Sequence, residues 1–110
     1  MSSVKRIVIG ITGGIAAYKI PLLIRLLKKK GFEIKVMLTP AARGLVGVDT
    51  LRTLSGNPVY QDDALTYDMD HIRLAEWGDL FLIAPATANT IGKIAHGIAD
   101  NLVTTSALSF

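Results

Sequence analysis

The sequence contains no cysteine, which excludes disulfide bonds, thiolate metal sites and a cysteine nucleophile within these 110 residues. It has only two histidines, so little is available to build a metal site. No run reaches the ~18 to 20 apolar residues that a membrane-spanning helix requires. The apolar stretch near the amino end is interrupted by Gly13, Gly14 and Lys19, which is unlike a secretory signal peptide. We therefore expect a cytoplasmic protein with no metal and no membrane partner.

Charge is also sparse. Charged residues make up 19% of the chain and hydrophobic residues 50%, a balance that favours a packed core over disorder. The basic residues that give the net charge of +3 are scattered, apart from Lys28–Lys30. That run is typical of the solvated last turn of a helix, where it complements the helix dipole. We expect no nucleic-acid partner, and the length predicts a single domain over residues 1–110.

The apolar pattern alternates between strands and helices. The predicted strands are Ile7–Ile11, Phe32–Leu38, Val59–Tyr60 and Leu80–Ala84. The first predicted helix is Ile15–Lys30, and a second, short helix is capped by Asp49 and ended by Gly56. A helical turn is predicted over His71–Trp77. Two further helical segments begin at about Thr90 and about Asn101. Pro21 either kinks the first helix or marks where its regular part starts. Residues 61–70 are expected to form a surface loop. The alternation predicts an α/β fold with a doubly wound parallel sheet.

Ligands of such sheets bind outside the carboxyl ends of the strands. Three small, polar exits follow predicted strands there: Thr12–Gly14, Thr39–Pro40 and Pro85–Asn89. The first matches neither the dinucleotide fingerprint, which needs glycine at Thr12, nor the P-loop. It fits either an anion at a helix N-terminus or a tight turn without a ligand. Thr39 and Asn89 each also fit an ordinary cap or turn, but the three exits together predict a site for a flat cofactor with a phosphate tail.

The two histidines carry no clear signal by themselves. His71 lies between the acidic 61–70 segment and the strand that leads to the third exit. Single histidines are more commonly structural or solvated than catalytic, and nothing in the sequence distinguishes His96. From the residues alone, both roles stay open for His71.

Two segments, "GITGGIAAYK" and "DHIRLAEWGDLFLIAPATANTIGKIAHGIADNL", closely resemble the flavin-dependent cysteine decarboxylases. The likeness is greatest to the phosphopantothenoylcysteine decarboxylase domain of bacterial coenzyme A synthesis and runs from about Lys5 to Phe110. The combination of the histidine with "PATANT" is specific, whereas the Gly-Gly loop alone is not.

This resemblance implies a Rossmann-like flavoprotein fold that binds FMN. It implies that His71 is the catalytic histidine, a role that suits a group with an unperturbed pKa near ~6.5. The reaction implied is FMN-dependent decarboxylation of 4'-phosphopantothenoylcysteine to 4'-phosphopantetheine. The implied cofactor contacts are Thr12, Gly13, Gly14, Ile15, Thr39, Pro85, Ala86, Thr87, Ala88 and Asn89.

The resemblance also implies features that these residues do not supply. An aromatic residue of the family is replaced by Leu45, and the family continues past Phe110 into a strand, a substrate-gripping segment and a flap. We therefore expect weak or no decarboxylation by the 110 residues alone. Family members form trimers, or dodecamers of trimers, with the flavin at subunit interfaces. We expect a homo-oligomer in which His71 serves a neighbour's flavin.

Three other functions are compatible with the same residues. One is a flavin prenyltransferase of the same superfamily, although "PATANT" and His71 favour the cysteine decarboxylases. Another is a non-enzymatic FMN-binding or regulatory subunit. The third is a domain that folds but binds nothing tightly.

Overall fold

A computed structural model of the chain describes residues 4–61, 67–85, 88–98 and 102–109. Within these residues the strands form one parallel sheet with the order β3-β2-β1-β4. The strands are β1 (Arg6–Ile11), β2 (Glu33–Leu38), β3 (Val59–Gln61) and β4 (Leu80–Ile83). This is the order of a doubly wound, Rossmann-like sheet, so the predicted fold class is confirmed.

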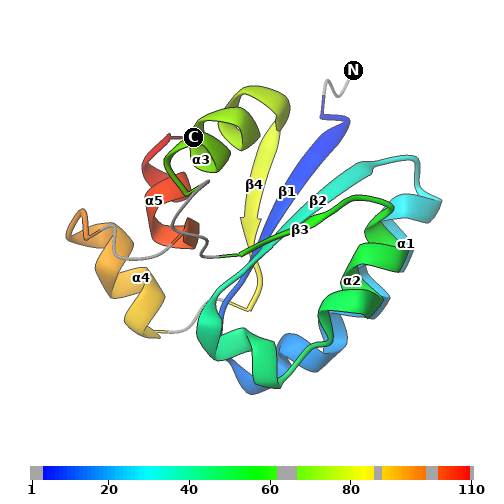
Figure 1. The fold of residues 1–110 in the computed structure, drawn as a ribbon, viewed down its shortest axis with the longest axis horizontal. Coiled ribbons are helices and arrows are strands. Elements are labelled where there is room, and N and C mark those ends of the chain that lie inside the picture. Colours follow the sequence, from blue (N-terminus) through cyan, green and yellow to red (C-terminus); the bar gives the residue numbers. More distant parts are fainter. Residues whose placement is uncertain (1–3, 62–66, 86–87, 99–101, 110) are drawn as a thin grey trace.

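Helices cover both faces of the sheet. The helices are α1 (Ile20–Lys29), α2 (Val48–Ser55), α3 (Tyr67–Trp77), α4 (Ala88–Ala95) and α5 (Leu102–Ser109), with 3-10 helices η1 (Ile15–Lys19) and η2 (Pro40–Gly44) after the first two strands. Figure 1 shows α1 and α2 on one face and α3 and α5 on the other. Of the helices described, none is long and apolar enough to cross a membrane.

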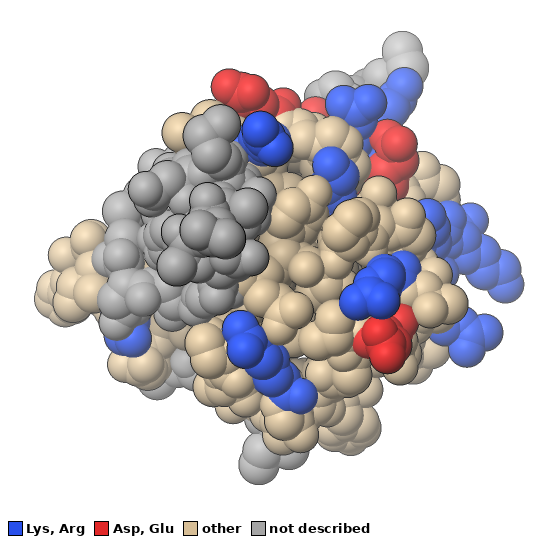
Figure 2. Space-filling view, viewed as in Figure 1, with Lys and Arg blue, Asp and Glu red and all other residues tan. Residues whose placement is uncertain are grey.

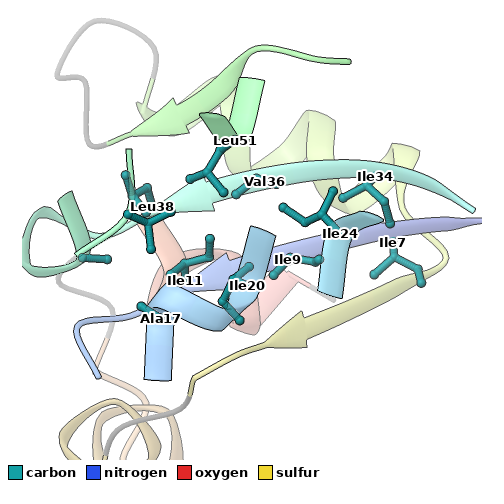
Figure 3. Packing of buried hydrophobic residues seen from close by; sticks show 12 residues of the cluster. Ile7, Ile9, Ile11, Ala17, Ile20, Ile24, Ile34, Val36, Leu38 and Leu51 are labelled. Carbon is teal, nitrogen blue, oxygen red and sulfur yellow. The ribbon is translucent and has the colours of Figure 1, made fainter. Parts of the chain in front are cut away.

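The core is built around β1. Its residues Ile7, Ile9 and Ile11 point to the face covered by α1 and pack in one cluster with Ile20 and Ile24 of that helix (Figure 3). Each of these side chains is buried. Burial of a side chain of this size stabilises the fold by about 1.5–3 kcal/mol, so this face anchors α1 firmly.

The other face of β1 carries a second cluster. There Val8 packs with Leu74 of α3 and Val103 of α5. Gly10 lies on the same face, where a Cβ atom would stand 3.1 Å from both Phe81 and the Val103 side chain. Glycine at this position therefore lets α5 approach the sheet closely. Burial on both faces explains why β1 is a continuous apolar run.

The structure decides how Pro21 acts. The predicted helix over Ile15–Lys30 divides into η1 and α1, and Pro21 lies in the first turn of α1. Proline is favoured there because the first helical N–H groups have no partner within the helix. Gly56 ends α2 with a φ of 73°, as predicted, in the left-handed region that favours glycine.

Three predicted boundaries are wrong. The N-cap of α2 is Gly47, and Asp49 instead lies in the first turn, where its carboxylate is 3.1 Å from the Arg52 guanidinium. The 61–70 segment is not all loop, because β3 extends to Gln61 and α3 begins at Tyr67; residues 62–66 lie outside the described part. The next helix, α4, begins at Ala88 rather than near Thr90.

The basic residues do not form one continuous patch on the visible face. Figure 2 shows Lys and Arg side chains spread over it, several of them along the edge where α1 lies. The Lys28–Lys30 run is exposed at the end of α1, as its sequence predicts.

Asp79 stabilises the amino edge of the sheet, where the strands begin. Its carboxylate accepts the Lys5 N–H at 2.9 Å and the Arg6 N–H at 3.0 Å. These backbone hydrogen bonds, that of Lys5 foremost, lower the pKa of Asp79. Beside them, the ring of Trp77 has the Arg6 guanidinium 5.6 Å and the Lys35 ammonium 4.6 Å from its centroid. Together these contacts join α3, β1 and β2 at this edge.

We expect Asp79→Asn to lower stability in a pH-dependent manner. The pKa of Asp79 is lower in the folded protein than in the unfolded chain. Its stabilising effect is therefore present above the ordinary value of about 3.9 and is lost as the pH falls through the folded pKa. Urea unfolding at pH 7 should give a lower midpoint for the variant than for the wild type, and the difference should shrink below about pH 4. An equal difference at pH 7 and pH 3 would contradict this role.

Candidate functional site

The three polar exits lie together at the carboxyl ends of the parallel strands, here called one edge of the sheet. β1 lies between β2 and β4, and both neighbours run parallel to it. The Thr39 N–H donates to the Ile11 carbonyl at 3.0 Å, and the Ala84 N–H donates to the Gly10 carbonyl at 3.0 Å. After β1 the chain adds β2 and then β3 on one side of that strand. It then crosses back to form β4 on the other side, so a topological switch point lies between β1 and β4. In Figure 1 this edge is the lower one.

The first exit is a tight turn. The Gly14 N–H donates to the Thr12 carbonyl at 2.9 Å, and the Ala17 N–H donates to the Gly14 carbonyl at 2.9 Å. The chain then enters the 3-10 helix η1, and α1 begins only at Ile20. The sequence predicted a helix directly after Gly14 whose dipole could hold an anion. The structure places the start of the α-helix further along the chain, so that dipole does not act at the glycines.

The first exit packs closely against the second. A Cβ atom on Gly13 would lie 2.6 Å from the Cβ of Ala41 in η2, much closer than two carbon atoms can approach. Gly13 itself is exposed. Glycine is therefore required here for the two exits to meet, and its bare backbone faces outwards where a ligand can approach.

Thr39 is the most informative residue of the second exit. It is 6% exposed, and its Oγ1 atom is buried without a hydrogen-bond partner among the residues that the structure describes. It stands at the N-cap position of η2, yet its side chain makes no capping bond, so the predicted capping role is wrong for the hydroxyl. A buried polar atom left unpaired costs about 1–3 kcal/mol. The hydroxyl is thus available to a ligand at this edge.

The third exit is tied to the first by a side chain. The Thr12 hydroxyl, which is buried, donates to the Pro85 carbonyl. The predicted contacts Ala86 and Thr87 lie outside the described residues. Asn89 is exposed and belongs to the first turn of α4 rather than to a loop. Of Ile15 and Ala88 the structure describes the backbone position, in η1 and α4.

His71 lies in α3, on the face of the sheet that α5 also covers. The last turn of α3 leads through Gly78 to Asp79 at the amino edge. His71 is six residues before the end of α3, or about 9 Å along the helix axis. It therefore belongs to the amino-terminal half of the helix, which is the half nearer the three exits. His96 is exposed just after α4. Among the described residues no group of three His, Asp or Glu side chains could hold a metal ion.

The three exits contain no acidic residue. Residues 12–15, 39–45 and 84–89 include one charged side chain, that of Arg43, which is exposed. These three segments therefore place no like charge beside an anionic group. Small side chains, an exposed glycine backbone and a buried unpaired hydroxyl fit a flat, partly anionic cofactor.

Two features of this region were not predicted. Ala41 contacts Gly13, but an alanine in a short helical turn carries no signal for such a contact. Ser106 of α5 has a buried Oγ atom that likewise lacks a partner among the described residues, and in the sequence it is one of several small polar residues in an apolar helix.

Comparison with protein families gives a match over the whole chain. The model described as Flavoprotein matches residues 1–110. The coenzyme A biosynthesis bifunctional protein CoaBC of Haemophilus influenzae is 49% identical over 108 residues, which cover 96% of this chain and 27% of that protein. The probable phosphopantothenoylcysteine decarboxylase of Streptococcus mutans is 45% identical, with 96% of this chain and 60% of that protein covered. The chain thus spans about a quarter of one relative and under two thirds of the other.

Solved structures share the fold. The FMN-dependent cysteine decarboxylase SpaF superposes with a TM-score of 0.85 at 31% identity, over 96% of this chain and 62% of that one. The alignment covers nearly all of the sheet and helices described above.

Proposed function

Because the chain belongs to the Flavoprotein family, we propose that it binds FMN and decarboxylates 4'-phosphopantothenoylcysteine to 4'-phosphopantetheine in coenzyme A biosynthesis. The substrate assignment is carried by the 45% identity to the probable phosphopantothenoylcysteine decarboxylase, which extends over 96% of this chain. The cytoplasm is the compartment that fits this pathway.

The three exits provide the contacts for FMN. Thr39 offers a buried hydroxyl without a partner among the described residues, and Gly13 offers an exposed backbone. The other proposed contacts are Gly14 and Ile15 at the end of the first exit and Pro85 to Asn89 of the third. When bound there, FMN would supply the two-electron redox chemistry that oxidises the cysteine side chain and so allows the carboxylate on the α-carbon to leave.

His71 supplies the proton chemistry in this proposal. Two-electron oxidation of a –CH2–SH group to a thioaldehyde, for which bound FMN would be the oxidant, would release the thiol proton, and the imidazole of His71 would accept it. An unperturbed imidazole has a pKa of about 6.5 and can accept and return a proton near neutral pH. The position of His71 in α3, in the half directed towards the three exits, supports this assignment.

A homo-oligomer is supported by an apolar stripe on the outer surface. Tyr18, Leu22 and Leu26 are spaced four residues apart along η1 and α1 and are 62%, 59% and 51% exposed. Residues with this spacing lie on one side of a helix, so the three side chains form one surface. Contact between copies would remove this surface from water. We propose a trimer, or a dodecamer of trimers, in which His71 serves the flavin of a neighbouring copy.

The first test concerns the Thr39 hydroxyl. In the FMN-free protein, Thr39→Val removes an unpaired buried hydroxyl, so the free energy of unfolding should not fall. The FMN dissociation constant should nevertheless rise about tenfold, the equivalent of one lost hydrogen bond of ~1.4 kcal/mol. Thr39→Ser is the matched control and should bind like the wild type. Unchanged FMN affinity in the valine variant would show that the hydroxyl serves no cofactor.

The second test separates catalysis from binding. His71→Asn should slow carbon dioxide release from 4'-phosphopantothenoylcysteine by about 100-fold or more, because it removes the proton acceptor. The assay uses single-turnover conditions with protein in excess over substrate. Weak carbon dioxide release can then still be measured. FMN absorbance should be retained, and His96→Asn, which alters the other, exposed histidine, serves as the control. Turnover by His71→Asn at the wild-type rate would contradict the catalytic role of His71.

The third test addresses assembly. At micromolar concentration, light scattering should give at least three times the 11.8 kDa of one chain. Leu22→Glu places a charge in the apolar stripe and should shift the mass towards that of a monomer. Thr53→Glu, at an exposed polar position of α2, should leave the mass unchanged. A monomeric wild type would refute the proposed assembly.

A further inference from the structure

The exits of β1 and β4 are connected by one side chain. From the contacts of the Thr12 hydroxyl, we infer that Thr12 is a positioning residue. It fixes the end of β4 against the end of β1 and thereby sets where the third exit and α4 begin. In this assignment Thr12 does not donate a hydrogen bond to the cofactor. The part of the inference that concerns FMN rests on the proposed function, and the part that concerns the exits does not.

Among the described residues, the backbone pairing of β1 with β4 ends just before Thr12 and Pro85. β1 and β4 are in parallel register, with Gly10 opposite Ile83, and the same register continued places Thr12 opposite Pro85. The Ala84 N–H still donates to β1, at the Gly10 carbonyl. The Thr12 hydroxyl donates to the Pro85 carbonyl and extends the pairing by a side chain.

The carbonyl and the hydroxyl proton of Thr12 are both used in hydrogen bonds within the protein. Its carbonyl accepts the Gly14 N–H at 2.9 Å and so holds the turn of the first exit. Its hydroxyl has a single proton, which goes to Pro85. Its side chain is buried, with 2% of the residue exposed. The two threonines of the site therefore differ, because the Thr39 hydroxyl lacks a partner among the described residues and that of Thr12 has one.

This contact lies at the topological switch point. On one side of it the chain proceeds through η1 to α1, and on the other it proceeds from β4 to α4. Since α4 begins three residues after Pro85, the anchor at Pro85 constrains the position of its first turn. Loss of the hydroxyl should therefore loosen α4 before any cofactor is present.

The experiment compares Thr12→Val, which keeps the shape of the side chain without the hydroxyl, with Thr12→Ser, which keeps the hydroxyl. Hydrogen exchange is measured in the FMN-free protein, and FMN affinity is measured separately by titration. In Thr12→Val, the amides of α4 should exchange about fivefold faster, as expected for one lost hydrogen bond, while those of α1 and β2 stay unchanged. The FMN dissociation constant should rise about tenfold. Thr12→Ser should stay within about twofold of the wild type in both measurements.

Faster exchange in α4 together with weaker FMN binding supports the inference. Unchanged exchange in α4 overturns it, and if FMN affinity alone falls, Thr12 is a direct ligand instead. If valine disturbs the packing, Thr12→Ala removes the hydroxyl without adding a methyl group. The alanine variant is then compared with Thr12→Ser in the same two measurements. A wild type that fails to bind FMN would refute the proposed function, whereas the exchange measurement would still decide the role of Thr12.

Discussion

The parallel hydrogen-bond ladders on the two sides of β1 are the constraint on which the rest of the molecule depends. Because β2 and β4 pair with the same strand, their ends fall at one edge. A backbone hydrogen bond to β1 then places the second exit, and another places the third. The strand can hold this position because its two faces are buried under different helices. Packing of the core and placement of the candidate site are therefore consequences of a single strand.

Much of this architecture is encoded locally. Continuous apolar runs identify strands buried on both faces, and glycines such as Gly56 identify helix ends. The errors occur where distant contacts decide. The start of α3 at Tyr67 has no strong periodic signal, and the helix is secured by contacts such as that of Leu74 with the core. The 3-10 geometry after Gly14 likewise has no counterpart in the helical spacing of the sequence.

The candidate site was predicted in outline but not in its internal connections. Small polar residues at three strand ends are visible in the sequence, and parallel topology brings such ends together. The sequence does not show that Thr12 and Thr39 differ. Thr12 meets Pro85 across 73 positions of the chain, and Gly13 meets Ala41 across η1, α1 and β2. Local spacing carries no information on contacts of this kind, so it could not predict that the two threonines differ in their contacts.

The placement of Trp77 has a practical consequence. It is the only tryptophan of the chain, and it lies at the amino edge of the sheet beside two cationic side chains. Indole emission responds to nearby charge and to exposure to water. The protein therefore carries its own fluorescent reporter at the edge opposite to the three exits. In the FMN-free protein, a change in that emission reports on the contacts of α3 with the first residues of β1 and β2.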